Sequence, residues 1–99
     1  MHIMKPSVLL SQYRDQVRSI ALRHRVASVK VFGSALHGDD AEGSDLDLLV
    51  EPTPQTTMFD IGGIQFEVSE LLGIEVDVVT PRALPASFRD RVLAEAQPL

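Results

Sequence analysis

The sequence predicts one small domain of the α/β or α+β class, in which helices pack on one face of a small mixed β-sheet. Two observations lead to this prediction. Apolar residues recur every three to four positions in some segments and alternate in others, which gives the order α-β-β-α-β-α. The chain has 99 residues, of which 44% are hydrophobic, and this is enough to fill one core. We therefore expect residues 1–99 to form a single domain.

The first half of the chain is expected to form a helix followed by two strands. The helix is predicted from Val8 to Arg25, where apolar residues follow helical spacing, and Ser7 is suited to cap its start. Val26–Phe32 alternates and is rich in β-branched residues, so it predicts a strand. Leu36–Gly43 has the composition of a loop, which can include one helical turn. Ser44–Val50 predicts a second strand, which the prolines of "EPTPQT" end.

The second half is expected to form a helix, a strand and a further helix. Met58–Leu72 carries apolar residues at helical spacing, and Gly73 stands where helices commonly end. A glycine pair in the middle of this helix weakens it by about 1 kcal/mol per glycine. Ile74–Thr80, "IEVDVVT", predicts a third strand, and a short helix is predicted over Pro85–Ala96.

Charge and composition exclude several classes of protein. With a net charge of −5, the domain as a whole has no basic footprint with which to hold nucleic acid through its phosphates. The chain has no cysteine, so it can form neither a disulfide framework nor a thiolate metal site. No apolar run approaches the roughly 20 residues needed to span a bilayer, and the first residues lack the pattern of a secretory signal. We expect a cytoplasmic protein that binds neither membranes nor nucleic acid directly.

Three aspartates stand in segments that otherwise have the pattern of strands. Asp45 and Asp47 share one face of the second strand, and Asp77 lies with Glu75 on one face of the third. Aspartate is disfavoured in strands. One interpretation is a sheet with one solvated face. The other is a metal site. Two carboxylates about 4 Å apart repel by roughly 4 kcal/mol at an effective dielectric constant of 20, and a bound divalent cation would offset this repulsion.

The metal interpretation gives a chemical reason for all three carboxylates. Mg²⁺ prefers oxygen ligands and keeps positions open for water and for substrate phosphates. Two carboxylates at positions i and i+2 of one strand can reach metal ions about 3.5–4 Å apart, and a third carboxylate can come from a neighbouring strand. This arrangement is suited to moving a phosphoryl or nucleotidyl group.

A Gly-Ser turn follows the first strand. Exposed N–H groups and the hydroxyl of Gly33-Ser34 can hold phosphates there. The turn is not a Walker A motif, because Asp39 and Asp40 stand where Lys and Ser or Thr are required. An EF-hand loop that starts at Asp39 is also excluded, because Val50 stands at its twelfth position, where a bidentate glutamate is required.

Taken together, "GSALHG", "SDLDLLV" and "VDVVT" resemble the minimal nucleotidyltransferases of the DNA polymerase beta superfamily. The signature of that family is a Gly-Ser turn, an Asp-x-Asp strand and a third aspartate on a later strand, and the resemblance covers nearly the whole chain. It implies that Gly33 and Ser34 bind the nucleotide phosphates and that Asp45 and Asp47 hold two Mg²⁺ ions. Asp77 would bind the catalytic metal and help to deprotonate the attacking hydroxyl.

The resemblance also implies a reaction and a partner. Members of this family are often antitoxins that transfer AMP from ATP to a tyrosine of a HEPN-family toxin, typically a ribonuclease, and so neutralise it. We therefore expect ATP as substrate and a hetero-oligomer with the toxin. His37 stands where the family often has an arginine, and a neutral imidazole is a poorer phosphate partner. Two alternatives stay open: an antitoxin that acts by direct binding alone, and nucleotidyl transfer to a small molecule.

Overall fold

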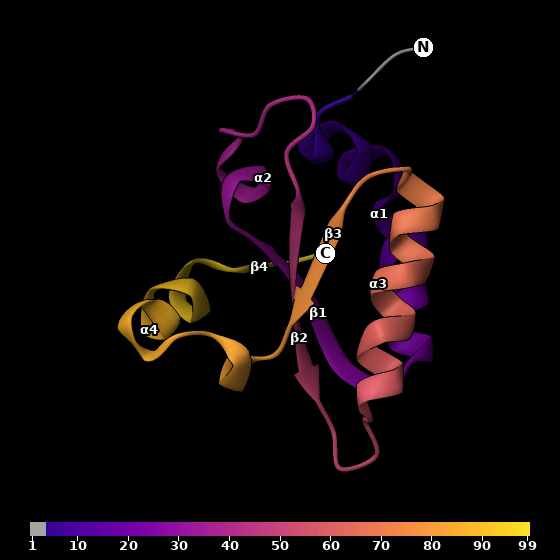
Figure 1. Cartoon of the computed structure of the whole chain (residues 1–99), viewed down its shortest axis with the longest axis vertical. Coiled ribbons are helices and arrows are strands. Elements are labelled where there is room, and N and C mark those ends of the chain that lie inside the picture. Colours follow the sequence, from indigo (N-terminus) through magenta and orange to yellow (C-terminus); the bar gives the residue numbers. More distant parts are fainter. Residues whose placement is uncertain (1–3) are drawn as a thin grey trace.

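The computed structural model describes residues 4–99, which form a mixed four-stranded sheet with helices packed against it (Figure 1). The strands lie in the order β3-β2-β1-β4. β1 is antiparallel to both β2 and β4, whereas β2 and β3 run parallel. The predicted fold class is confirmed, and the sheet gains a short fourth strand that the sequence pattern did not predict. The strands are β1 (Val26–Phe32), β2 (Leu46–Pro52), β3 (Val76–Val79) and β4 (Gln97–Pro98).

Two long helices cover one face of the sheet, as predicted, but the prediction that all the helices pack on that face does not hold for α4. α1 and α3 pack against each other and against the strands, and Figure 1 shows them together on the right. α4 lies on the opposite side, where Val92 and Ala96 pack with Leu49 and Leu84 in a second, smaller apolar cluster. Within residues 4–99 the helices are α1 (Pro6–Arg23), α2 (Ser34–His37), α3 (Met58–Leu72) and α4 (Ala86–Glu95), with a 3₁₀ turn at Pro81–Ala83.

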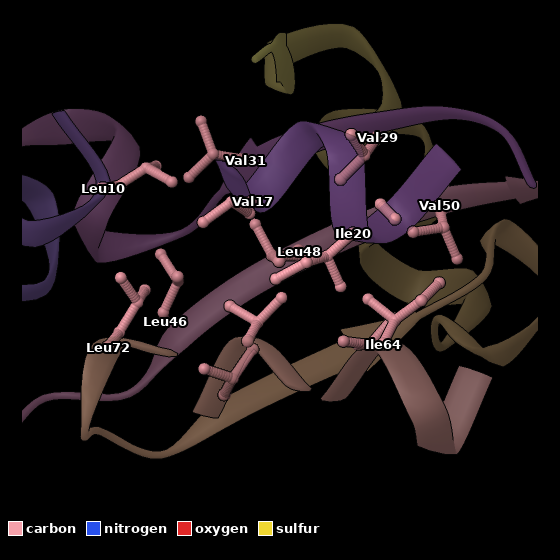
Figure 2. Close-up of a cluster of buried hydrophobic side chains, with 14 of the residues drawn as sticks. Leu10, Val17, Ile20, Val29, Val31, Leu46, Leu48, Val50, Ile64 and Leu72 are labelled. Carbon is pink, nitrogen blue, oxygen red and sulfur yellow. The ribbon is translucent and has the colours of Figure 1, made fainter. Parts of the chain in front are cut away.

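The main core lies between the sheet and the two long helices (Figure 2). Leu46, Leu48 and Val50 of β2 point into it and are 0% exposed, as are Val17 of α1 and Ile64 of α3. Successive residues of a strand point to opposite faces. The residues between these three on β2 therefore point to the other face of the sheet.

The bounds of β1 and α3 agree with the prediction, while those of β2 are shifted. β2 runs over Leu46–Pro52 and not over Ser44–Val50. The reason is local, because Ser44 closes a turn with Ala41: the Ser44 N–H donates to the Ala41 carbonyl and the Ala41 N–H donates to the Ser44 hydroxyl, both at 3.0 Å. The third strand is shorter than predicted, at Val76–Val79.

The start of α1 is capped from a distant loop. α1 begins at Pro6, and the Ser7 N–H donates to Asp40 Oδ2 at 2.7 Å. Asp40 is 4% exposed; burial alone would raise the pKa of its carboxyl, but hydrogen bonds from Ser7 hold that pKa below its ordinary value. The prediction that Ser7 itself caps the helix is wrong, because a carboxylate 33 residues away takes that role.

α3 begins and ends at recognisable cap residues. Thr57 and Asp60 form a capping box at its start, each side chain accepting from the backbone N–H of the other. Gly73, in the left-handed conformation, ends it as predicted. None of the helices within residues 4–99 has the length and apolar character needed to cross a bilayer.

Candidate active site

The three predicted aspartates gather at one end of β2 and β3. In the parallel ladder Asp47 is the Cα partner of Asp77, so adjacent strands about 4.8 Å apart carry these two residues. Asp45 directly precedes β2 and lies near enough for its charge to act on Asp47. All three stand away from the main core, which takes the alternate residues of both strands. The crowding of carboxylates expected from the sequence is therefore present.

Asp47 is the partly buried member of the three, whereas Asp45 and Asp77 are exposed. Burial raises the pKa of the Asp47 carboxyl, and the charges of Asp77 and Asp45 raise this pKa further. The protein environment thus disfavours the charged form of Asp47. A bound cation would remove this penalty.

The donor set of these carboxylates fits Mg²⁺. Among residues 4–99, no three His, Cys, Asp or Glu side chains stand already converged around a common metal position. The aspartates nevertheless offer only oxygen donors, which is the ligand type that Mg²⁺ selects. The repulsion that raises the pKa of Asp47 is the second observation in favour of a cation. The exposed Asp45 and Asp77 side chains can turn toward an ion without displacing core residues.

The Gly-Ser turn lies directly against Asp47. Phe32, the last residue of β1, is the Cα partner of Asp47, and Gly33 follows it. A Cβ on Gly33 would come within 2.5 Å of Asp47 Oδ2, and Gly33 has a φ of +74°, a conformation that favours glycine. Ser34 then begins α2, and the first N–H groups of a helix have no partner within it. The turn and the carboxylates, which are separate in sequence, therefore lie side by side in the fold.

A cavity that the sequence analysis did not predict borders the same turn. It has a volume of about 450 Å³ and lies between α2 and α4. Across it, His37 Nε2 of α2 lies 3.2 Å from Glu95 Oε2 of α4. The signal in the sequence was the spacing of Phe88, Val92 and Glu95, which puts these residues on one side of a helix. The cavity is lined by Phe32, Gly33, His37, Phe88, Arg91, Val92 and Glu95.

The nucleotidyltransferase domain family matches residues 10–99 of this chain. A proposed protein adenylyltransferase of Methanocaldococcus jannaschii is 33% identical over 87 residues, which cover 88% of this chain and 94% of that protein. The solved structure of a proposed minimal nucleotidyltransferase superposes with a TM-score of 0.84 at 40% identity, covering 94% of this chain and 95% of its own.

A more distant structural neighbour shares the fold alone. It is a toxin–antitoxin crystal structure with AMP-PNP, which is 17% identical with a TM-score of 0.63 and covers 94% of this chain and 71% of its own. The family match spans nearly the whole chain and includes both the Gly-Ser turn and the three aspartates. The chain therefore belongs to the nucleotidyltransferase domain family, as one of its minimal members.

Proposed function

We propose that this enzyme transfers AMP from ATP to a tyrosine of a HEPN-family toxin, in a Mg²⁺-dependent reaction that neutralises the toxin. The observation that carries the proposal is the register of Asp47 with Asp77, with Gly33 packed against Asp47. A phosphate-binding turn would then stand beside the carboxylates that a nucleotidyl transfer needs.

In the proposed reaction, the Gly33 and Ser34 backbone and the Ser34 hydroxyl bind the phosphates of ATP. Asp45, Asp47 and Asp77 would hold two Mg²⁺ ions, which would neutralise the phosphates and polarise the reacting oxygens. The tyrosine oxygen attacks the α-phosphorus, the bond from this phosphorus to the bridging β-phosphate oxygen breaks, and pyrophosphate leaves. Asp77 receives the phenol proton at a carboxylate oxygen.

Two further observations support a protein as the acceptor. Asp77 is exposed on β3, the strand at one edge of the sheet, so a side chain of another molecule can approach it. The similar archaeal protein is itself a proposed protein adenylyltransferase, and the structural neighbour with AMP-PNP is a toxin–antitoxin structure. We also propose that residues 1–99 act as one cytoplasmic domain, in a hetero-oligomer with the toxin and without direct contact to nucleic acid.

The proposal is tested with ATP labelled at its α-phosphate, Mg²⁺ and the product of the neighbouring gene. Label is expected on the partner and is expected to vanish with Asp45→Asn or Asp77→Asn. Asp15→Asn on α1 is the matched control, since it removes one exposed carboxylate elsewhere, and it should leave labelling unchanged. Replacing the modified tyrosine of the partner by phenylalanine should also abolish labelling.

A second candidate function is neutralisation of the toxin by direct binding alone. The contact of His37 with Glu95 favours it, because an imidazole held by a carboxylate is less available to a nucleotide phosphate. This function predicts that Asp45→Asn and Asp77→Asn still neutralise the toxin, with no label on it. That result would overturn the transfer proposal.

A further inference from the structure

We propose that the cavity between α2 and α4 binds the nucleobase of the nucleoside triphosphate, and that Phe88 is the surface on which the base stacks. The inference rests on the proposed function in one respect, which is that a nucleotide occupies the Gly33-Ser34 turn. It goes beyond that function because it assigns a base site, which neither the aspartates nor the turn supplies.

The position and size of the cavity suit the base. Gly33 belongs both to the phosphate turn and to the cavity wall, so a nucleotide whose phosphates lie at the turn can reach the cavity directly. The volume of about 450 Å³ falls within the usual range of small-molecule sites, roughly 300–1,000 Å³. A nucleoside therefore fits in the space that the turn borders.

The wall of the cavity is suited to a flat aromatic ring. Phe88 is 37% exposed although it stands on the side of α4 that carries Val92, and Phe32 contributes a second ring. Arg91 lines the same space, and a planar guanidinium stacks on aromatic faces. Stacking on aromatic side chains is a common way to hold bases with little dependence on their identity.

The charges of the cavity give a phosphate no net attraction, because the Glu95 carboxylate offsets the Arg91 guanidinium. Glu95 contributes a carboxylate to the wall, and this carboxylate contacts the imidazole of His37 at 3.2 Å. A triphosphate tail in this space would meet that negative charge together with apolar surface. The uncharged base meets neither penalty.

The sheet order argues against the acceptor side chain as its occupant. Asp77 stands on β3, at one edge of the sheet, with β2 between it and β1. The cavity is bordered by Phe32 and Gly33 at the end of β1. An acceptor that gives its proton to Asp77 therefore approaches from the β3 edge, away from the cavity.

The inference is tested by calorimetric titration of the full chain. One titration uses Mg²⁺ and a non-hydrolysable ATP analogue, and a separate one uses inorganic tripolyphosphate. Phe88→Ala should weaken binding of the analogue by about tenfold, which is ~1.4 kcal/mol, and should leave tripolyphosphate binding unchanged. Phe88→Tyr keeps the ring and should restore analogue binding. Phe59→Ala is the matched control, since Phe59 is an exposed ring of α3, on the other side of the sheet.

The outcomes separate this inference from the proposed function. Unchanged analogue affinity in Phe88→Ala overturns the base site and leaves the transfer reaction standing. Equal losses for analogue and tripolyphosphate also overturn it, because the cavity would then serve the phosphates. If Phe88→Ala instead raises only the KM for the partner protein, measured by label transfer, the cavity serves the acceptor and the base site is overturned. If the base-dependent loss is found but no label reaches any partner, the base site stands and the transfer proposal fails.

Discussion

Within the site, Gly33 lies tightly against Asp47. The turn requires glycine for two reasons. Its φ is positive, and the contact with Asp47 leaves no room for a Cβ. The sequence showed the glycine, but its contact with Asp47 depends on the antiparallel register of β1 and β2, which only the structure supplies.

Gly33→Ala is expected to abolish transfer and to lower the free energy of unfolding by about 1–3 kcal/mol, because a φ of +74° with a ψ of −152° is a backbone conformation that essentially only glycine adopts. Gly38→Ala is the matched control, because Gly38 has a φ of +71° but no heavy atom lies within 4 Å of the place that a Cβ would take there. It should lose less stability than Gly33→Ala, because its ψ of +13° places it in the left-handed helical region, and it should keep most of the activity. Both variants are compared by thermal unfolding and by label transfer. A Gly38→Ala variant that loses as much activity as Gly33→Ala would contradict this view.

Asp47→Asn is expected to abolish transfer yet raise stability in metal-free buffer. The pKa of the Asp47 carboxyl is higher in the folded protein than in the unfolded chain. The wild type therefore loses stability as the pH rises from the ordinary pKa to the raised one. Asparagine does not ionise, so the variant does not lose this stability. The gain in melting temperature should be absent in acid and present at pH 7. Added Mg²⁺ should stabilise the wild type and not the variant. A variant that is less stable than the wild type at pH 7 would mean that the carboxylate has a structural role.

Among the elements, the loop between β1 and β2 is joined to α1 through Asp40. In the sequence, Asp39 and Asp40 were two acids in a loop, and nothing in the pattern separated the exposed one from the buried one. The separation comes from the fold, which brings the loop to the first turn of α1. Asp40 therefore holds the loop that connects the two halves of the site.

Asp40→Ala is expected to cost about 1 kcal/mol of stability, the usual value of a helix cap. Because the pKa of Asp40 is lowered on folding, its contribution is present above the ordinary value of 3.8 and is lost as pH falls through the lowered one. Asp39→Ala, at an exposed carboxylate, should change stability little. Urea unfolding at pH 7 and in acid would reveal the difference, and an Asp40 effect that grows in acid would refute the cap.

The glycine pair of α3 has two different environments. A Cβ on Gly63 would come within 2.5 Å of His24 Cε1, whereas Gly62 has nothing within 4 Å. His24, which follows α1, also contacts Glu67 of α3 through Nε2. Its Nδ1 lies 3.8 Å from Asp60 Oδ1. Gly63 thus makes room for the side chain that joins the two long helices.

Gly62→Ala is expected to stabilise the protein by about 0.5–1 kcal/mol, from helix propensity alone. Gly63→Ala should instead lower stability, because the new methyl group displaces His24 from α3. Both variants should retain full transfer activity, since α3 covers the face of the sheet opposite the aspartates. Chemical denaturation distinguishes the two, and equal stabilisation by both would show that His24 moves freely.

Across the molecule, the sheet separates the main core on one face from the proposed active site on the other. Alternation along β2 and β3 predicted this division, and it placed Asp45, Asp47 and Asp77 together on the face away from the core because a strand has only two faces. The position of α4 and the cavity beside it were not predictable in the same way. They depend on contacts such as that between His37 and Glu95, which are 58 positions apart in the sequence.

The most direct test is the anomalous diffraction of crystals grown with Mn²⁺ and a non-hydrolysable ATP analogue. Two metal peaks about 3.5–4 Å apart are expected between Asp45 and Asp47, with Asp77 bound to one of them and the phosphates on the Gly33-Ser34 turn. Metal peaks away from these aspartates, or a nucleotide that does not contact the turn, would contradict the assignment of this site.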